Sequence, residues 1–513
     1  DQNKSAKSDH VRRSDIVDRN GVLLARSLRT ASLYADPSLI QEHESVAKNL
    51  SQIFPDLNYG QTLQKLQREG RFVWLKRNLT PEEQQKVLYL GEPGLGFKDE
   101  DRRMYPQAEL VSHLVGYSSV DGEGIAGVEA SFDKVLASEN NSLALTLDVR
   151  FQHALRRELQ NAVSKFKAKG AAGIIMDVRK GEVLASVSLP DFDPHKISEA
   201  SDAQKFNKAT LGAYELGSVF KVFSVAAYLD SQKNPMRQAF DAREPLKRRG
   251  ISSINDFYAQ ERILSLPEVF IHSSNIGTAL MAEAMGTKTL KEYYERFGLI
   301  GKSSLEIPEV ATTRFHSPWQ EVDTLSASFG HAIAVTPLQL VSGVASIVNG
   351  GERVEPTLIF NQDVVAKKGE RIISPKTAHR MRQLLRLNVT DGSGQSADVS
   401  GLMIGGKTGT AEKPGPGGYD RDRRLSSFVG VFPMDDPMYA VYVMIDEPKG
   451  IKETHGFATA GWTAAPTAGK VVGSIANLIG MTPEVEVSNF EGSLRQFVKT
   501  EEQIKEERRA QSH

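Results

Sequence analysis

The sequence predicts an α+β protein built from two domains and a short tail. A chain of 513 residues, 40% hydrophobic and 25% charged, has the length and composition of a globular protein with a large core. Strand patterns lie on both sides of a long stretch of helical patterns, which favours one sheet assembled from distant segments and flanked by helices. We therefore expect an N-terminal α+β domain in residues 1–140, the main α+β domain in residues 141–485 and a charged tail in residues 486–513.

The N-terminal domain is predicted from short apolar runs in a charged background. Residues 18–21 (DRNG) indicate a tight turn between two strands, because Asn-Gly adopts positive φ at low cost. Residues 81–90 (PEEQQKVLYL) predict a helix, since proline and acidic residues favour the first helical turn. The apolar runs are short, so we expect this domain to be loosely packed.

The main domain begins with a predicted strand at residue 143, which a helix follows. Two apolar runs on either side of residues 179–181 (RKG) then predict a hairpin. Periodicity predicts further strands at residues 402–410, 426–433 and 439–446, and helices at residues 218–230, 276–286 and 289–297. Residues 501–513 hold seven charges in thirteen positions and predict a solvated helix at the end of the chain.

Composition excludes several classes of function. The 63 basic and 64 acidic residues leave a formal charge of -1, so the chain has no overall field for a polyanion, and nucleic acid is not an expected partner. Cysteine is absent, which excludes thiol catalysis, thiolate metal sites and disulfides. No stretch approaches about 18 uninterrupted apolar residues, the length needed to span a membrane. The chain starts with a polar lead and no methionine, so we expect that an upstream signal or anchor was removed.

Ser218 and Lys221 form the first candidate catalytic motif. They stand three positions apart at the start of a predicted helix, so their side chains lie on the same face. A serine hydroxyl becomes a nucleophile when a neighbouring base takes its proton, and a lysine can act as that base where burial or a second cation favours its neutral form. Taken alone, the spacing is also compatible with an ordinary surface pair.

Two further motifs follow along the chain. Ser273 and Asn275 lie in a turn ahead of a predicted helix, where an N-cap is the alternative interpretation. Lys407 to Thr410 (KTGT) alternates like an edge strand, in which Gly409 would let a substrate backbone approach. An ordinary strand with a glycine bulge is equally compatible with this segment by itself.

In this order, the three motifs resemble those of the penicillin-recognising serine enzymes, the penicillin-binding proteins and serine β-lactamases. Residues 13–24 (RSDIVDRNGVLL) resemble the N-terminal signature of class B penicillin-binding proteins, with Ser14 where the family usually has glycine. The phrases GGKTGTAEKPGPGGYDRDRRLSSFVGVFP and GFATAGWTAAPTAG are most similar to division-type (FtsI-like) transpeptidases. The resemblance covers nearly the whole chain except the last ~30 residues; the elongation-type class B enzyme remains the alternative within the family.

The resemblance implies a fold and a reaction. The main domain would be a penicillin-binding transpeptidase domain with a five-stranded antiparallel sheet flanked by helices, and the N-terminal domain a non-catalytic pedestal of the dimerisation type. Ser218 would attack the D-Ala-D-Ala amide of a peptidoglycan stem peptide, with Lys221 as base. Ser273 would relay a proton to the leaving amine, and Asn275 would orient Lys221 and the substrate. The backbone N–H groups of Ser218 and Thr410 would form the oxyanion hole.

The remaining site residues belong to the third motif. Lys407 would supply positive charge, while Thr408 and Thr410, beside Gly409, would bind the terminal carboxylate of the substrate. The chemistry needs no metal or organic cofactor. Partners implied by the resemblance are peptidoglycan stem peptides or their lipid-linked precursor, β-lactam antibiotics, an FtsW-like membrane glycosyltransferase and division-complex proteins. The implied location is the periplasmic face of the inner membrane, with an N-terminal anchor upstream of this sequence and a role in septal cell-wall synthesis.

Several other features of the sequence suggest different families, and each meets an objection. Residues 401–408 (GLMIGGKT) match a P-loop, but glycines and prolines downstream forbid the helix that a phosphate-binding loop needs. Residues 122–127 match a dinucleotide fingerprint without a surrounding βαβ pattern and predict a turn. The sequence has no Glu-x-x-Leu-Asn element of a class A β-lactamase and no Glu-Asp-x-x-Phe glycosyltransferase signature. A sensor that acylates without turnover would carry the same three motifs.

Overall fold

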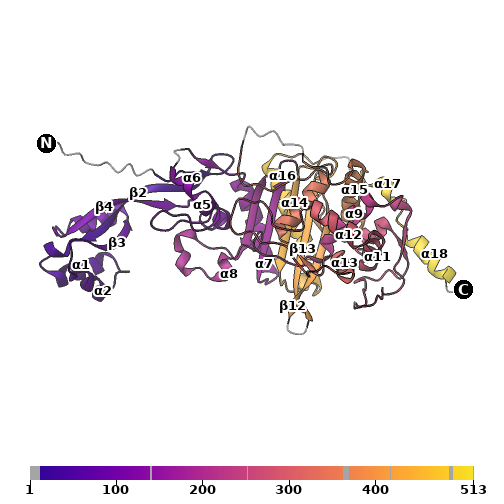
Figure 1. Ribbon diagram of the computed structural model, residues 1–513, viewed down its shortest axis with the longest axis horizontal. Coiled ribbons are helices and arrows are strands. Elements are labelled where there is room, and N and C mark those ends of the chain that lie inside the picture. Colours follow the sequence, from indigo (N-terminus) through magenta and orange to yellow (C-terminus); the bar gives the residue numbers. More distant parts are fainter. Residues whose placement is uncertain are drawn as a thin grey trace. The chain divides into compact units, whose positions relative to one another are not determined.

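The computed structural model describes residues 12–138, 141–250, 252–361, 369–415, 418–483 and 489–511, which fold into two compact units (Figure 1). The first unit consists of Asp1–Val17, Leu23–Gln107 and Gly116–Leu143, and the second of Asp18–Val22, Ala108–Val115 and Ala144–His513. Both contain helices and strands, so the α+β class is confirmed. No helix in the described parts of the chain is long and apolar enough to cross a membrane.

The first unit is built around a five-stranded sheet. Its strands are β1 (Ile16–Val17), β2 (Leu23–Ala35), β3 (Val73–Leu79), β4 (Leu95–Met104) and β5 (Leu143–Ala144), in the order β3-β2-β1-β5 with β4 also paired to β2. Its helices are α1 (His43–Ile53), α2 (Tyr59–Leu66), α3 (Pro81–Leu88), α5 (Gly127–Ser131) and α6 (Asp133–Ser138). Leu33 and Leu75 from the sheet and Leu50 from α1 share one buried core.

Two local signals in the first 140 residues, one for a turn and one for a helix, predicted the structure correctly. The turn expected at residues 18–21 follows β1 and precedes β2, and Gly21 adopts the positive φ of 82° that Asn-Gly sequences favour. The helix expected at residues 81–90 is α3. Thr80 accepts a hydrogen bond from the Glu83 N–H, and the Glu83 carboxylate accepts one from the Thr80 N–H, which satisfies two exposed backbone donors.

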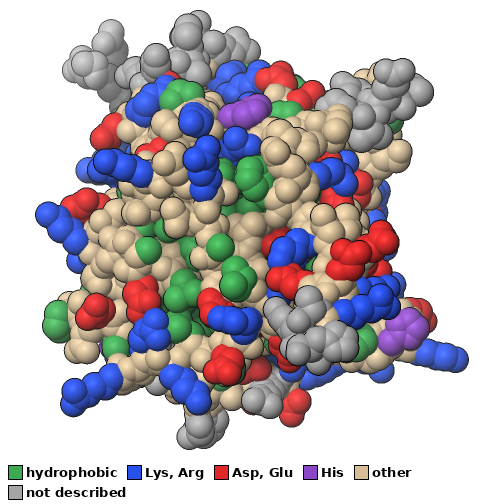
Figure 2. Space-filling model, turned by 90° about the vertical axis from the view of Figure 1, so that its right-hand side faces the viewer, with side chains coloured by type: hydrophobic (Ala, Val, Ile, Leu, Met, Phe, Trp, Pro, Cys, Tyr) green, Lys and Arg blue, Asp and Glu red, His purple; other side chains and the backbone are tan. Residues whose placement is uncertain are grey.

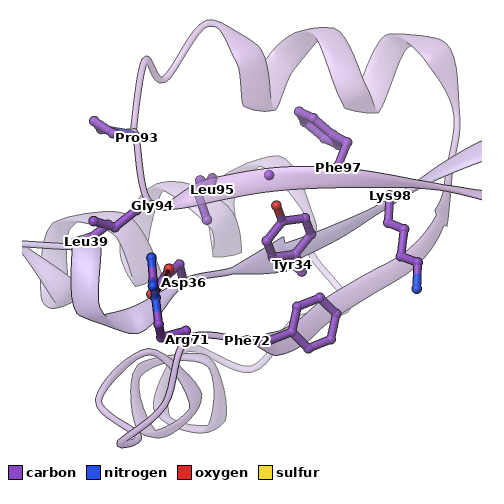
Figure 3. A pocket seen from close by; sticks show the side chains of 11 residues that line it. Tyr34, Asp36, Leu39, Arg71, Phe72, Pro93, Gly94, Leu95, Phe97 and Lys98 are labelled. Atoms are coloured by element: carbon purple, nitrogen blue, oxygen red, sulfur yellow. Dashed lines mark hydrogen bonds and ion pairs between the residues drawn. The ribbon is translucent and has the colours of Figure 1, made fainter. Parts of the chain in front are cut away.

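A hollow of about 600 Å³ lies beside β2 and β4 in this unit (Figure 3). The Tyr34 and Phe72 rings stack there with their centroids 4.9 Å apart. Tyr34 pairs with Gly96 across the two strands, and a Cβ atom at Gly96 would lie 2.5 Å from the Tyr34 ring. Gly96 therefore leaves the space in which the Tyr34 ring lies flat on the sheet.

The second unit is built around another five-stranded sheet, which is antiparallel throughout. Its order is β12-β13-β14-β6-β7, formed by β6 (Gly170–Asp177), β7 (Val183–Leu189), β12 (Gly405–Gly415), β13 (Gly418–Phe432) and β14 (Tyr439–Asp446). Strands from both ends of the unit meet at β6 and β14, so the predicted assembly of one sheet from distant segments is confirmed. The hairpin predicted around residues 179–181 joins β6 and β7.

Two strand boundaries differ from the predicted ones. The strand expected at residues 402–410 begins at Gly405, because Met403 adopts a positive φ of 44° that ends any extended segment before it. The strand expected at residues 426–433 begins as early as Gly418. Its first half is charged and pairs with the far end of β12, so no apolar alternation marked it in the sequence.

The second unit also contains many helices and two short strand pairs in addition to its main sheet. Long helices are α7 (Val149–Lys165), α9 (Lys221–Ser231), α11 (Asn275–Met285), α12 (Thr287–Arg296), α14 (Pro337–Val348), α15 (Pro375–Asp391), α16 (Ala464–Leu478) and α18 (Glu501–Gln511). Shorter ones are α4 (Ser112–Val115), α8 (Asp202–Lys205), α10 (Leu266–Ile271), α13 (Glu321–Ala327) and α17 (Gly492–Arg495), beside the short strand pairs β8 (Ala239–Asp241) with β9 (Ile263–Ser265) and β10 (Arg314–Phe315) with β11 (Ile333–Ala334). The predicted helices at residues 276–286 and 289–297 are α11 and α12.

One hydrophobic core of the second unit lies between its sheet and two helices. Helix α7 packs on β6 and β7, and α16 packs on β13 and β14. Leu155, Ile175 and Val471 are all buried in this shared core. Figure 2 shows the side of the molecule toward the C-terminus, where apolar side chains gather centrally and charged side chains of both signs surround them. The mixed signs agree with the near-neutral net charge of the chain.

Candidate active site

Ser218 lies on a tight turn directly before α9. The turn is the 3-10 helix η4 (Gly217–Phe220), and Lys221 is the first residue of α9, so the predicted helix at residues 218–230 begins one turn late as an α-helix. Gly217 adopts a φ of 60°, and a Cβ atom there would lie 2.8 Å from the Thr410 carbonyl oxygen. A glycine is therefore needed for this turn to lie against strand β12, which brings Ser218 next to the third motif.

The Lys221 amine is the centre of the cluster. Its Nζ atom lies 3.1 Å from Ser218 Oγ, 3.2 Å from Ser273 Oγ and 2.7 Å from Asn275 Oδ1, so the structure brings the first two motifs together. The Nζ atom also donates to the Ser273 carbonyl oxygen at 2.5 Å. The side chain is fully buried, and burial together with the charge of Lys407 holds the pKa of Lys221 well below its ordinary value. A neutral Lys221 can accept the proton of Ser218.

Ser273 and Asn275 flank the true N-cap of helix α11. The cap is Ser274, whose Oγ accepts a hydrogen bond from the Gly277 N–H at 2.9 Å. Ser273 adopts a φ of 57°, an uncommon conformation for serine. Because Ser274 satisfies the helix end, the Ser273 and Asn275 side chains are available to Lys221.

Asp256 holds this turn in place, although nothing in the sequence singled it out. Its carboxylate accepts hydrogen bonds from Ser274 Oγ at 2.7 Å and from the Ile276 N–H at 3.0 Å. The Asn275 amide also donates to the carbonyl oxygen of Asn255 at 3.0 Å. The loop around residues 255–256 thus orients the second motif from a position 18 residues before Ser274.

Lys407 lies inside strand β12 and contacts the second motif. Its buried Nζ atom donates to Ser273 Oγ at 3.0 Å and to the Thr408 carbonyl oxygen at 3.3 Å. Burial lowers the pKa of Lys407 to about 7. In the pairing of β12 with β13, Lys407 lies opposite Val429. Residues 401–408 therefore lead into strand β12, which continues to Gly415, and not into a helix. The P-loop alternative is therefore excluded, because its phosphate site needs a helix N-terminus.

The rest of the third motif faces two different neighbours. A Cβ atom at Gly409 would lie 2.6 Å from the Leu216 carbonyl oxygen, so the glycine makes room for the segment that leads into the Ser218 turn. The hydroxyls of Thr408 and Ser393 lie 2.7 Å apart, and Thr410 Oγ1 accepts a hydrogen bond from the Ala460 N–H at 3.0 Å. The sequence did not indicate Ser393, which follows helix α15.

Glu215, three residues before Ser218, is tied to two other segments. Its carboxylate accepts hydrogen bonds from the Tyr419 hydroxyl at 2.8 Å and from the Ala332 N–H at 3.0 Å. Burial and the neighbouring Glu215 carboxylate raise the pKa of Tyr419. The Gly217 N–H donates to the Gly330 carbonyl oxygen at 3.2 Å, so the loop at residues 330–332 supports the turn that holds Ser218 from a second side.

The cluster suits nucleophilic catalysis by oxygen and nitrogen groups. One continuous chain of hydrogen bonds runs from the Ser218 hydroxyl to the buried Lys221 amine, on to the Ser273 hydroxyl and then to the buried Lys407 amine. Within the described ranges, no group of three or more His, Asp or Glu side chains is placed to hold a metal ion. The arrangement supports acyl transfer, in which protons move along the chain while the hydroxyl attacks a carbonyl.

Known families match both units of the chain. The Penicillin binding protein transpeptidase domain matches residues 171–470, and the Penicillin-binding Protein dimerisation domain matches residues 8–167. The probable peptidoglycan D,D-transpeptidase FtsI of Caulobacter vibrioides is 38% identical over 494 residues, covering 94% of this chain and 84% of that protein. The peptidoglycan D,D-transpeptidase FtsI of Escherichia coli is 29% identical over 508 residues, covering 92% and 84%.

Solved structures share the fold over nearly the same length. A peptidoglycan synthetase from Bifidobacterium adolescentis matches with a TM-score of 0.73 at 20% identity, covering 94% of this chain and 97% of that one. Penicillin binding protein 3 from Mycobacterium tuberculosis, complexed with aztreonam, matches with a TM-score of 0.71 at 23% identity, covering 93% and 99%. With both domains matched in order and a relative 38% identical over most of its length, this chain belongs to the penicillin-binding protein family of peptidoglycan D,D-transpeptidases.

Proposed function

We propose that this protein is a serine D,D-transpeptidase that cross-links peptidoglycan stem peptides through an acyl-enzyme at Ser218. One observation supports this most strongly: a single buried amine, Lys221 Nζ, lies within hydrogen-bond distance of Ser218 Oγ, Ser273 Oγ and Asn275 Oδ1. A base in contact with both the nucleophile and a second hydroxyl can take a proton in one step and return it in the next.

Acylation begins when Ser218 Oγ attacks the carbonyl carbon between the last two D-alanines. Lys221 takes the hydroxyl proton as the new C–O bond forms. The backbone N–H groups of Ser218 and Thr410 stabilise the negative oxygen of the tetrahedral intermediate. The C–N bond then breaks, Ser273 passes the proton from Lys221 to the leaving nitrogen, and D-alanine departs with a neutral amine.

The third motif recognises the end of the donor peptide. Lys407 supplies a positive charge, and the Thr408 and Thr410 hydroxyls donate hydrogen bonds to the terminal carboxylate. Thr410 Oγ1 accepts from the Ala460 N–H, which leaves its own O–H free to donate. The same geometry supports covalent inhibition by β-lactams, whose ring carbonyl takes the place of the peptide carbonyl.

Deacylation uses an amine of a second stem peptide in place of the serine. The amine attacks the acyl carbon, its proton passes to Lys221, and Ser218 Oγ leaves and regains a proton from the same lysine. No metal or organic cofactor takes part. The similarity to FtsI proteins favours a role in septal synthesis. The proposal also places the protein at the periplasmic side of the inner membrane, alongside an FtsW-like glycosyltransferase, with the first unit as a non-catalytic pedestal.

A donor–acceptor assay tests this function. A synthetic stem peptide ending in D-Ala-D-Ala is incubated with the protein and with an excess of an amine acceptor, and products are followed by mass spectrometry. We expect a product that has lost one D-alanine and gained the acceptor, and no product from Ser218→Ala. Donor hydrolysis without acceptor transfer would contradict the transpeptidase assignment, and an unchanged Ser218→Ala variant would contradict the nucleophile.

A further inference from the structure

Residues 489–500, here called the C-terminal clamp, are bonded to helices of the second unit, within the segment 486–513 that the sequence predicts as a charged tail. Leu494 is fully buried and Glu491 is 3% exposed, while most of α18 beyond them is exposed. A buried leucine and a buried carboxylate within a charged end segment indicate specific docking. The clamp therefore has a defined place in the fold.

One end of the clamp is bonded to helix α15. The Gln383 side-chain amide donates to the Phe490 carbonyl oxygen at 2.9 Å and to Ser493 Oγ at 3.2 Å. Arg495 forms an ion pair with Asp391, the last residue of α15, at 3.0 Å. These contacts run along α15 to its C-terminal end.

The other end of the clamp is bonded to helix α10. Ser265, the N-cap of α10, donates through Oγ to the Phe497 carbonyl oxygen at 2.6 Å. The Lys499 N–H donates to Glu268 Oε1 at 2.9 Å. Glu268 is almost fully buried, where it pairs with the buried Arg262 at 2.9 Å. The backbone of the clamp thus donates a hydrogen bond to the buried Glu268 carboxylate in the first turn of α10.

Helices α10 and α15 each lead directly to one wall of the active site. Ser273 lies two residues after the end of α10. Ser393 lies two residues after the end of α15, and its hydroxyl contacts the Thr408 hydroxyl. The two helix ends also touch, because a Cβ atom at Gly392 would lie 2.9 Å from the Ile271 carbonyl oxygen. The clamp is bonded to both helices, one of which carries the second motif and the other supports the third.

We propose that the C-terminal clamp is a positioning element for acylation, which holds α10 and α15 together so that Ser273 stays in register with Lys221 and Lys407. This proposal rests on the proposed function, since it concerns the chemistry of the same site. The hydrogen bonds and the ion pair of the clamp named above go to residues of α15, of α10 and of the α10 N-cap, and not to Ser218. Its effect is transmitted through the 3.0 Å contact between Ser273 and Lys407, which spans the two walls. A displacement of about 1 Å at such a contact can cost a reaction about 100-fold.

Lys499 offers a matched pair of variants. Lys499→Pro removes the N–H that bonds Glu268, whereas Lys499→Ala keeps that N–H and loses only the side-chain pair with Glu507. Arg495→Ala and the conservative Arg495→Lys form a second pair at the α15 end. A chain ending at Thr500 removes α18 and keeps the whole clamp. Each protein is checked by thermal unfolding and assayed well below its melting temperature.

The readout separates binding from chemistry. Stopped-flow acylation by a fluorescent penicillin gives the dissociation constant of the non-covalent complex and the rate constant of acylation. We expect Lys499→Pro and Arg495→Ala to lower the rate constant about tenfold or more with little change in the dissociation constant. Lys499→Ala, Arg495→Lys and the chain ending at Thr500 should stay within about twofold of wild type.

The results for the variants test the clamp, and the result for the wild-type protein tests the proposed function. Folded Lys499→Pro and Arg495→Ala proteins that acylate at the wild-type rate would overturn the proposal, as would an equal loss in Lys499→Ala. A wild-type protein that penicillin does not acylate would instead refute the proposed function. If Lys499→Pro does not fold, the positioning role is tested by comparing Arg495→Ala with Arg495→Lys. An equal loss of the acylation rate constant in both variants would contradict that role.

Discussion

The Nζ atom of Lys407 lies 3.0 Å from the Oγ atom of Ser273, so a strand residue and a turn residue 134 positions apart share one hydrogen bond. Ser273 Oγ also lies 3.2 Å from Lys221 Nζ. A hydroxyl between two buried amines can accept from one and donate to the other only if at least one amine is neutral. The charges of the two lysines also act on each other directly, since the Lys407 charge adds to the effect of burial and lowers the pKa of Lys221 further.

The first prediction concerns the pH dependence of acylation. The rate should rise with pH as Lys221 loses its proton, and burial and the Lys407 charge hold that pKa below its ordinary value. Lys407→Gln removes the charge, so the pKa of Lys221 should rise and the acidic limb of the pH–rate profile should move to higher pH. Lys470→Gln, an exposed change on α16, is the control. A limb that stays in place or moves to lower pH would show that Lys407 does not act on Lys221.

The second prediction concerns Thr410. Thr410→Val removes the hydroxyl that we propose donates to the substrate carboxylate and leaves the Ala460 N–H without its acceptor, whereas Thr410→Ser keeps the hydroxyl for both bonds. A hydrogen bond to a charged group is worth about 1.5–3 kcal/mol, so acylation by penicillin should fall about 10- to 100-fold in the valine variant. The serine variant should remain close to wild type. A valine variant that acylates at the wild-type rate, with the loss confined to the serine variant, would mean that the methyl group matters and the hydroxyl does not.

The third prediction concerns Asp256. Asp256→Ala removes the acceptor for Ser274 Oγ and the Ile276 N–H, so the turn that presents Ser273 and Asn275 should loosen. Acylation should fall by up to about 100-fold, the effect of misplacing a reacting group by about 1 Å. Asp241→Ala, at an exposed aspartate paired with Arg243, is the matched control. Wild-type acylation by a folded Asp256→Ala protein would refute the positioning role.

The fourth prediction concerns the first unit. Glu129 is fully buried and pairs with Arg13 at 2.6 Å and Arg103 at 2.7 Å. Glu129→Gln leaves two buried guanidinium groups without a full counter-charge and should destabilise this unit by about 3 kcal/mol. Calorimetry should show a lower unfolding temperature, with acylation at Ser218 unchanged and Glu123→Gln, at an exposed position, unaffected. A stable Glu129→Gln variant would mean that other contacts support the unit.

The fifth prediction concerns the lifetime of the penicillin adduct. Glu215 is the carboxylate closest in sequence to Ser218, but both of its oxygens already accept hydrogen bonds, from Tyr419 and from the Ala332 N–H. It is therefore poorly placed to activate water, and the adduct should persist for many minutes after free penicillin is removed. Intact-mass measurements over time follow the decay. Decay within seconds, slowed in Glu215→Gln, would assign Glu215 as a hydrolytic base.

Local patterns predicted much of the fold and the site. Ser218 and Lys221 lie one helical turn apart, so their contact follows from spacing alone. The hairpin at residues 179–181 and helix α3 also follow from signals within a few residues. The order of the three motifs along the chain led to the family, which both domain matches confirm.

Contacts between distant segments could not be predicted from these patterns. Asp256 and Ser393 support the motifs from loops whose sequences carry no periodicity or motif of their own. The charged half of β13 has no apolar alternation, and its pairing with β12 becomes visible only in the sheet. In residues 486–513, which the sequence predicts as a charged tail, no periodic pattern marks Leu494 as a residue that becomes fully buried.

The most direct test of the central claim is peptide mapping of the protein after incubation with benzylpenicillin. The account predicts one adduct per chain, carried by the peptide that contains Ser218, and no adduct in Ser218→Ala. Wild-type protein quenched before addition of the drug serves as the blank. An adduct on any other residue, or one that persists in Ser218→Ala, would contradict the assignment of Ser218 as the nucleophile.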